Sequence, residues 1–246
     1  MKRWLTFVMA LALAVALGGV VSRVPEALAE VEAFRVREVR LRGARFLTED
    51  EAIKTLALSE RASVWDDTKV LEARVKDHPL VAEVKIHRRF PSALLLQVVE
   101  REPVALFPNP MLEPVDESGT ILPIDPTAHK LDLPLMVAEG AGGPGSLTPA
   151  GLRLLAGEIS RLAQGDPELH SAISDFALHP RGDVRARISD PPVTLHFRPG
   201  LSSGRIRTGL RVLRDAQAKF DEGAVVDLDL RFENQVVVRF GRVRGN

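Results

Sequence analysis

The sequence of 246 residues contains no cysteine. Disulfide bonds, thiolate metal sites and a cysteine nucleophile are therefore excluded. The compartment is not fixed by this absence, because an exported protein large enough to build a core folds without disulfides. An excess of charge is also missing, since 33 lysines and arginines balance 33 aspartates and glutamates. No global electrostatic field therefore points to nucleic acid or to an anionic surface as a ligand.

Catalytic and cofactor-binding motifs are missing as well. None of the six histidines pairs with another at a spacing of three or four residues on an expected helix, so no metal motif arises. The glycine-rich stretch 138–146 lacks the Lys-Ser/Thr of a phosphate-binding loop, and no GxSxG or GxGxxG motif occurs. The carboxylate clusters at 49–51 and 66–67 lie at expected helix starts, where negative charge is favourable. We therefore expect no catalytic residue, metal, cofactor or small-molecule substrate.

One long apolar run is present near the N-terminus. Lys2 and Arg3 precede 18 uncharged residues, 4–21. A membrane-spanning helix needs about 20 apolar residues, and the two preceding cations favour a cytoplasmic N-terminus. A cleaved signal peptide is the alternative, because Ala-Leu-Ala at 27–29 fits a cleavage site, although the apolar core is longer than usual. Both interpretations export residues 30–246.

The segment after this run predicts a small α+β unit. Residues 34–43 alternate like a strand with a change of phase near Glu38, which a bulge or a strand start would explain. Thr48 and Glu51 form a capping-box pattern at a helix start. A second helix is expected from about Asp66. The helix positions expected to face the core are Ile53, Leu56, Ala57, Val70, Leu71 and Val75.

Two strands complete this unit. Residues 82–89 alternate with one polar face. Residues 93–99 are apolar on both faces, as in a central strand. The order strand, helix, helix, strand, strand places the helices on one face of a sheet.

The rest of the chain predicts a second unit with more strands. A turn is expected at 117–120, and a helix begins after Thr148 with Pro149 in its first turn. Residues 227–240 alternate strictly on both sides of a turn at 233–235, which is typical of a β-hairpin. Strands are expected around 173–178, 184–188 and 193–197, and a further helix carries an apolar stripe of Ile206, Leu210 and Leu213.

Three arginines share one face of that last helix. Arg207, Arg211 and Arg214 follow one another at spacings of four and three residues. A solvated face beside the apolar stripe is the simpler interpretation. The alternative is a secondary docking patch for an acidic partner segment.

Four stretches, taken in order, resemble the bacterial cell-division family FtsQ/DivIB. The first two, within 36–107, resemble its FtsQ-type POTRA domain (a polypeptide-transport-associated module), and the last two resemble its distal β domain. The similarity covers roughly residues 36–240. The stretches are VREVRLRGARFLTEDEAI, VWDDTKVLEARVKDHPLVAEVKIHRRFPSALLLQVVEREPVALF, LEPVDESGTILPI and VVDLDLRFENQVVVRF.

The resemblance implies an α+β fold in three parts. An N-terminal transmembrane helix is followed by a small POTRA domain (β-α-α-β-β) and then by a mostly antiparallel β domain with flanking helices. The expected divisions are a cytoplasmic tail at 1–3, an anchor at 4–21, a spacer at 22–33, the POTRA domain at 34–102, the β domain at 103–241 and a tail at 242–246.

The resemblance also implies a function. The family consists of non-catalytic scaffolds of the septal division complex, with a single span in the bacterial inner membrane and the C-terminal part in the periplasm. They recruit FtsB and FtsL and help to control septal peptidoglycan synthesis. In that family the final strands bind FtsB by strand addition. On this sequence the contact falls on Arg231, Phe232, Asn234, Val236, Val237, Val238 and Phe240.

The strand at 236–240 is therefore expected to be a sheet edge. Its alternation predicts Val236, Val238 and Phe240 toward the core, with Val237 and Arg239 on the other face. Such edges are normally protected because they invite aggregation, so an open edge needs a partner. A periplasmic POTRA-containing binding protein, a secretion or outer-membrane assembly factor, and an exported cell-wall hydrolase are the alternative functions. The hydrolase is disfavoured because no convergent carboxylates stand out.

Overall fold

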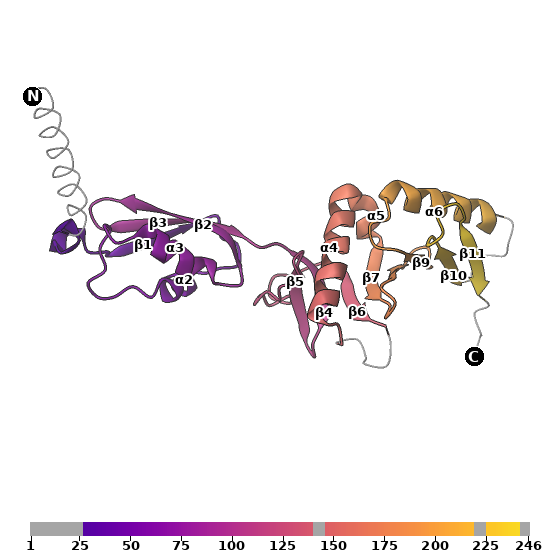
Figure 1. Cartoon of the computed structure of the whole chain (residues 1–246), viewed down its shortest axis with the longest axis horizontal. Helices are drawn as coiled ribbons and strands as arrows, with labels where there is room; N and C mark the ends of the chain where they lie inside the picture. The colour runs from indigo at the N-terminus through magenta and orange to yellow at the C-terminus, as the bar shows by residue number, and fades with distance from the viewer. Residues whose placement is uncertain (1–26, 140–145, 219–224, 242–246) are drawn as a thin grey trace, which may run out of the picture. The chain divides into compact units, whose positions relative to one another are not determined.

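The computed structural model describes residues 27–139, 146–218 and 225–241. The chain divides into two compact units, Met1–Arg101 and Glu102–Asn246 (Figure 1). The predicted anchor at 4–21 and the two predicted tails lie outside the described residues. Among the helices that are described, none has the length and apolar character needed to cross a membrane.

The first unit is a three-stranded sheet with two α-helices. The central strand β3 pairs in parallel with β1 and antiparallel with β2, so the sheet order is β1-β3-β2. Helix α2 contacts β1, and α3 contacts β2. The bounds are η1 (Glu32–Phe34), β1 (Glu38–Arg42), α2 (Glu49–Leu56), α3 (Thr68–Lys76), β2 (Val81–Arg89) and β3 (Ala93–Glu100).

Local signals predicted these elements well. Strand β1 begins at Glu38, so the change of phase there marks a strand start rather than a bulge. The capping box forms as expected, because the Thr48 side chain accepts from the Glu51 N–H and the Glu51 side chain accepts from the Thr48 N–H. Asp67 caps α3 in the same way through the N–H of Lys69. These side chains satisfy N–H groups that have no partner within the helix.

Three expected core positions are wrong. Ile53 and Val70 are 41% and 48% exposed, and Ala57 is exposed as the left-handed C-cap residue of α2. The two helices have eight and nine residues, and so short a helix buries only a narrow stripe at i and i+4. In α2 this stripe consists of Ala52 and Leu56, and in α3 it consists of Leu71 and Val75.

The second unit is an eight-stranded sheet in the order β11-β10-β9-β8-β7-β6-β4-β5. Strands 173–178, 184–188 and 193–197 and both long helices were predicted, whereas β6 and the short helix α5 were not. The bounds are β4 (Pro103–Pro108), β5 (Leu112–Asp116), β6 (Leu135–Ala138), α4 (Pro149–Gly165), α5 (Pro167–Ser171), β7 (Ile173–Leu178), β8 (Val184–Ile188), β9 (Val193–Phe197), α6 (Ser203–Gln217), β10 (Val225–Asp229) and β11 (Val237–Gly241).

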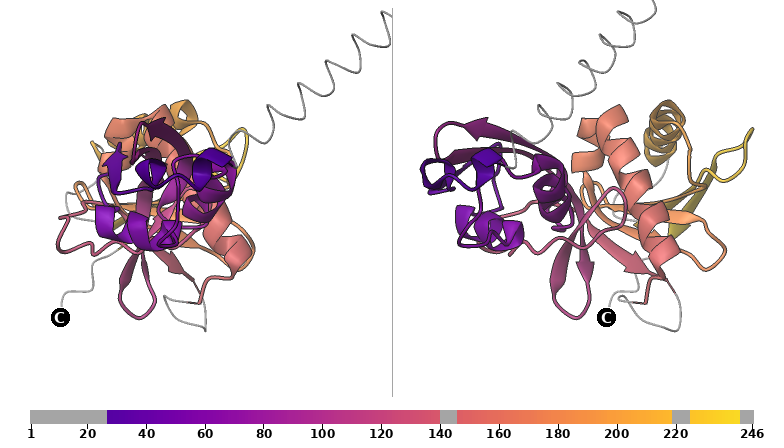
Figure 2. Two further views of the ribbon diagram at one scale, coloured as in Figure 1. Left: turned by 90° about the vertical axis from the view of Figure 1, so that its left-hand side faces the viewer. Right: turned by 60° about the vertical axis from the view of Figure 1, so that its left-hand side comes forward.

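The sheet is mixed, with antiparallel pairs in a small majority. Among the described strands, four neighbouring pairs are antiparallel and three are parallel, namely β4 with β6, β6 with β7, and β9 with β10. Two of the parallel pairs involve the unpredicted strand β6. Figures 1 and 2 show α4, α5 and α6 gathered on one side of these strands. Their apolar stripes join a single core cluster that contains Leu155, Ile159, Leu169, Ile206 and Leu213.

The final hairpin has a wider turn than predicted. Strand β10 ends at Asp229, and β11 begins only at Val237. Leu228 and Leu230 are buried as expected, whereas Phe232 is 51% exposed. The pairing stops early because the Asp229 carboxylate accepts the N–H of Arg231 and also binds its guanidinium group, which turns the chain away from the ladder.

Candidate partner-binding edge

Strand β11 forms one end of the large sheet. It pairs antiparallel with β10, and no further described strand lies beyond it. An edge strand presents N–H and C=O groups that can pair with another chain.

The opposite edge of this sheet is covered by the chain itself. Residues 120–122 fold back along β5 and bind its outer side. The Leu122 N–H donates to the Pro114 oxygen at 2.8 Å, and the Asp116 N–H donates to the Thr120 oxygen at 3.0 Å. Strand β5 is therefore a poor site for an added strand.

At both edges of the small sheet, a glutamate from a neighbouring helix accepts a hydrogen bond from a backbone N–H of the edge strand. On β1, the Leu41 N–H donates to the Glu49 carboxylate at 3.4 Å. On β2, the Ile86 N–H donates to the Glu72 carboxylate at 2.8 Å. Charged groups placed along an edge are a common way to prevent pairing with other chains. Among the described sheet edges, β11 is therefore the one whose N–H and C=O groups are least covered by other parts of the chain.

The side chains of β11 follow the predicted alternation in part. Val236 and Val238 are partly buried and pack against the core of the second unit. Val237 is half-buried, and Arg239 is exposed. Phe240, which the alternation places toward the core, is 38% exposed. Its position near the end of an edge strand leaves it with neighbouring strands on one side only.

Arg231 is occupied by contacts within the unit. Its guanidinium group donates to both oxygens of Asp229, at 2.9 and 2.6 Å, and to Asp183 at 3.0 Å. These hydrogen bonds keep the pKa of the Asp229 carboxyl below its ordinary value. The pair fixes the end of β10 to the β7–β8 turn, so this arginine positions the start of the hairpin. Phe232 and Asn234, by contrast, have exposed side chains in the turn that follows.

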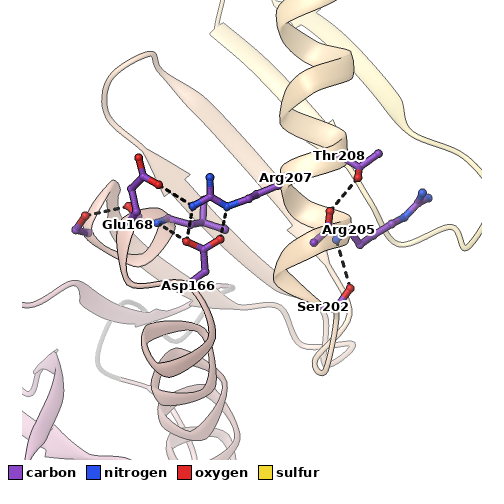
Figure 3. A network of polar contacts seen from close by, with 9 residues as sticks. Asp166, Glu168, Ser202, Arg205, Arg207 and Thr208 are labelled. Atoms are coloured by element: carbon purple, nitrogen blue, oxygen red, sulfur yellow. Dashed lines mark hydrogen bonds and ion pairs between the residues drawn. The ribbon is translucent and has the colours of Figure 1, made fainter.

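A positioning residue that the sequence analysis missed is Arg205. From the first turn of α6 its guanidinium group donates to the carbonyl oxygens of Phe232 and Gln235, both at 3.1 Å. Figure 3 shows its place beside the Ser202 cap of the helix. A single arginine therefore holds the turn that leads into β11. No sequence signal marks such a contact, because a side chain bound to carbonyl oxygens 27 and 30 residues away leaves no pattern.

The three arginines predicted as a docking patch are not equivalent. Arg207 donates to both oxygens of Asp166, at 2.5 and 2.6 Å, and to Glu168 at 2.8 Å (Figure 3). The pKa of Arg207 is raised by these bonds, and the pKa of Asp166 is lowered, chiefly by Arg207. The positive charge of Arg207 is thereby neutralised within the unit. Arg211 donates to Thr208 at 3.2 Å.

A cleft of about 230 Å³ lies beside this patch, between α5, α6 and the β8–β9 turn. Leu169, Leu210 and Leu213 line it, and Arg207 and Arg214 lie on its rim. Acidic residues share the same lining, namely Glu168 and Asp190. This mixture of charges gives the cleft less preference for an acidic segment than the sequence pattern predicts.

The described residues contain no group of three or more histidines, aspartates or glutamates arranged to hold a metal ion. His170 illustrates the structural use of such side chains here. Its ring lies over Phe176 with 6.5 Å between centroids, and burial lowers its pKa. A histidine that is neutral and packed against the core serves as an apolar side chain.

Comparison with known proteins identifies the first unit. Residues 34–101 match the family model described as "POTRA domain, FtsQ-type". A protein of Anaeromyxobacter sp. named "Cell division protein FtsQ" is 28% identical over 220 residues, which cover 86% of this chain and 73% of that protein. A protein of Myxococcus fulvus with the same name is 26% identical over 202 residues, which cover 80% and 70% of the two chains. Another protein of that name, from Salinibacter ruber, is 28% identical over 183 residues and 68% of this chain.

Proposed function

We propose that this chain, a homologue of the FtsQ cell-division proteins with their type of POTRA domain, is a non-catalytic scaffold of the bacterial division machinery. Its POTRA domain occupies residues 34–102, and its β domain occupies residues 103–241. Residues 4–21 anchor it in the inner membrane by a single span, with the C-terminal part in the periplasm. The protein is enriched at the division septum, where it helps to control septal peptidoglycan synthesis through contacts with other proteins.

The observation that carries this proposal is the contrast between β11 and the other sheet edges. Chain segments or glutamates cover β1, β2 and β5, whereas β11 ends the large sheet without a further described neighbour. In strand addition, main-chain hydrogen bonds supply affinity, and pockets for alternate side chains supply specificity. A site of this kind needs no catalytic group.

The partner that best fits this edge is an extended periplasmic segment of an FtsB-like protein, with an FtsL-like protein in the same assembly. The partner strand would lie along β11 and meet the outer face that carries Val237 and Arg239. Phe232 and Asn234 in the exposed turn would meet residues that flank the added strand. Arg231 and Arg205 would act indirectly, because both hold the hairpin in place.

Fluorescence microscopy of dividing cells tests the function. A fluorescent protein fused to the full chain should be enriched at midcell before constriction. The matched control is the same fluorescent protein fused to residues 1–33, which should spread evenly over the cell envelope. An even distribution of the full-length fusion would contradict a role in division.

A further inference from the structure

The first unit carries an aromatic cluster at the end of its sheet where the chain enters from the N-terminal side. Phe34, Trp65 and Phe90 come from three separate segments. The ring centroids of Trp65 and Phe90 are 5.1 Å apart, and Phe34 lies 6.0 and 6.3 Å from them. The Arg88 guanidinium lies 5.9 Å above the Trp65 ring.

Backbone contacts fix the place of this cluster. The β2–β3 turn, which carries Phe90, lies beside the segment that leads into β1, since the Arg37 N–H donates to the Ser92 oxygen at 2.8 Å (Figure 1). The Val64 N–H donates to the Phe34 oxygen at 2.9 Å, which joins the segment around Trp65 to the same end. The cluster therefore lies at the end of the small sheet where β1 begins.

Part of the cluster is open to solvent. Phe90 is 56% exposed, and Val31 in the preceding segment is 43% exposed. Trp65 lies deeper, and its Nε1 atom is buried without a hydrogen-bond partner among the described residues. The exposed phenylalanine over the tryptophan therefore leaves apolar surface uncovered at this end of the small sheet.

Two exposed cations lie in the segments that carry the cluster. Arg37 and Arg89 are exposed and have no partner in the part of the chain that the structure describes. The acidic residues of the same segments are already engaged: Asp66 accepts the Ser63 N–H, Asp67 caps α3, and Glu38 is paired with Arg40. Glu30 and Glu32 are the remaining carboxylates of these segments. Arg37 and Arg89 are therefore the exposed cations at this end that remain free to bind an anionic group.

The length of chain before the cluster restricts what that partner is. Phe34 follows the uncharged run 4–21 by 13 residues. Thirteen residues span at most about 45 Å when fully extended. If the run is a membrane anchor, as the proposed function requires, the cluster cannot move far from the lipid surface. Tryptophan, phenylalanine and arginine are the residues that soluble domains present to the membrane interface.

We propose that the Phe34–Trp65–Phe90 cluster is a membrane contact that seats the first unit on the lipid surface. Phe90 enters the boundary between headgroups and acyl chains, and Arg37 and Arg89 bind anionic headgroups. This proposal depends on the membrane anchor at 4–21 that is part of the proposed function, but it does not depend on the partner site at β11. It fixes which end of the first unit faces the membrane.

The two tryptophans of the chain make this measurable, because they are Trp4 and Trp65. In a Trp4→Phe variant of the full chain, Trp65 is the only tryptophan. This variant is reconstituted into vesicles of phosphatidylglycerol and phosphatidylcholine, with or without bromine on the acyl chains. We expect a loss of Trp65 emission in the brominated vesicles, since bromine quenches only at short range.

Three further variants on the Trp4→Phe background separate the contact from tethering alone. Phe90→Ser and Arg89→Glu should each diminish the loss of emission. The control Val99→Ser removes a side chain that is 55% exposed near the other end of β3, and it should leave the loss unchanged. The ratio of emission in the two kinds of vesicle is compared within each variant, which cancels any direct effect of Phe90 on Trp65. Arg89→Glu preserves the aromatic rings, so the test survives if Phe90→Ser unfolds.

Flotation of the same samples distinguishes the two ways in which the proposal fails. If the chain floats with the vesicles and Trp65 emission is equal with and without bromine, the contact is wrong while the anchor stands. An equal loss of emission in the parent, Phe90→Ser and Arg89→Glu chains also overturns the contact. A chain that does not float overturns the contact and the anchor together, and neither result bears on strand addition at β11.

Discussion

At the end of β3, Glu100 accepts hydrogen bonds from the three consecutive N–H groups of residues 45–47. The loop that they form begins at Gly43, whose φ is +83°. A Cβ atom at this position would lie 2.3 Å from the carbonyl oxygen of Val98. The absence of a side chain is what allows the loop to cross β3 and reach Glu100.

Gly43→Ala should therefore destabilise the first unit by about 2–4 kcal/mol, through left-handed strain and overlap with the backbone. The matched control is Gly182→Ala. Gly182 has a similar φ of +86°, but nothing lies within 4 Å of the added Cβ. The control should lose only about 1 kcal/mol, from strain alone. Urea unfolding followed by circular dichroism checks both, and equal losses would show that contact with Val98 is unimportant.

Asp229 should give the second unit part of its acid sensitivity. Its pKa is lowered, first by the hydrogen bonds from Arg231. The stabilisation is therefore fully present above the ordinary carboxyl pKa of about 3.9 and is lost as the pH falls through the lower folded value. Asp229→Asn should cost about 2 kcal/mol at pH 7 and flatten the decline of stability below pH 4.

Asp215→Asn is the control for this pair, because Asp215 is exposed on α6. Thermal unfolding between pH 7 and pH 3 compares the two variants with the parent. A decline that is as steep in Asp229→Asn as in the parent would show that another carboxylate carries the effect.

At the scale of elements, the success of prediction depended on whether the signal was local. The capping box of α2 and the start of α4 were predictable, since each depends on residues within three positions of one another. Strand β6 was not. It has four residues, and its partners are Leu106 in β4 and residues of β7. Nothing within so short a segment indicates pairing with strands about 30 and 40 residues away.

The turn before β11 depends on one side chain of α6. Arg205→Ala should remove its two hydrogen bonds to the Phe232 and Gln235 oxygens. We expect faster amide exchange in β11 and a loss of about 1–3 kcal/mol of local stability. The control Arg211→Ala, on the same helix, removes only a bond to Thr208. Hydrogen–deuterium exchange measures both, and unchanged exchange of β11 in Arg205→Ala would contradict a positioning role.

At the scale of the whole molecule, the sequence predicted only in part which sheet edges are exposed and which are covered. The alternation of residues 227–240 indicated a hairpin, and the resemblance to the FtsQ/DivIB family implied that its last strand is an edge. The protection of the other edges was not predictable, because Glu49 and Glu72 are ordinary surface residues in their own helices. Their role depends on which strand N–H groups the fold brings to them.

The central claim is that β11 accepts a partner strand. Titration calorimetry of residues 30–246 with a segment of an FtsB-like protein tests it most directly, comparing the parent with Val237→Glu. The control Val212→Glu places the same charge on α6, where Val212 is 40% exposed. Val237→Glu should weaken binding at least tenfold, or about 1.4 kcal/mol, while its thermal midpoint moves by only a few degrees. Val212→Glu should bind like the parent. A folded Val237→Glu variant with unchanged affinity would contradict strand addition at this edge.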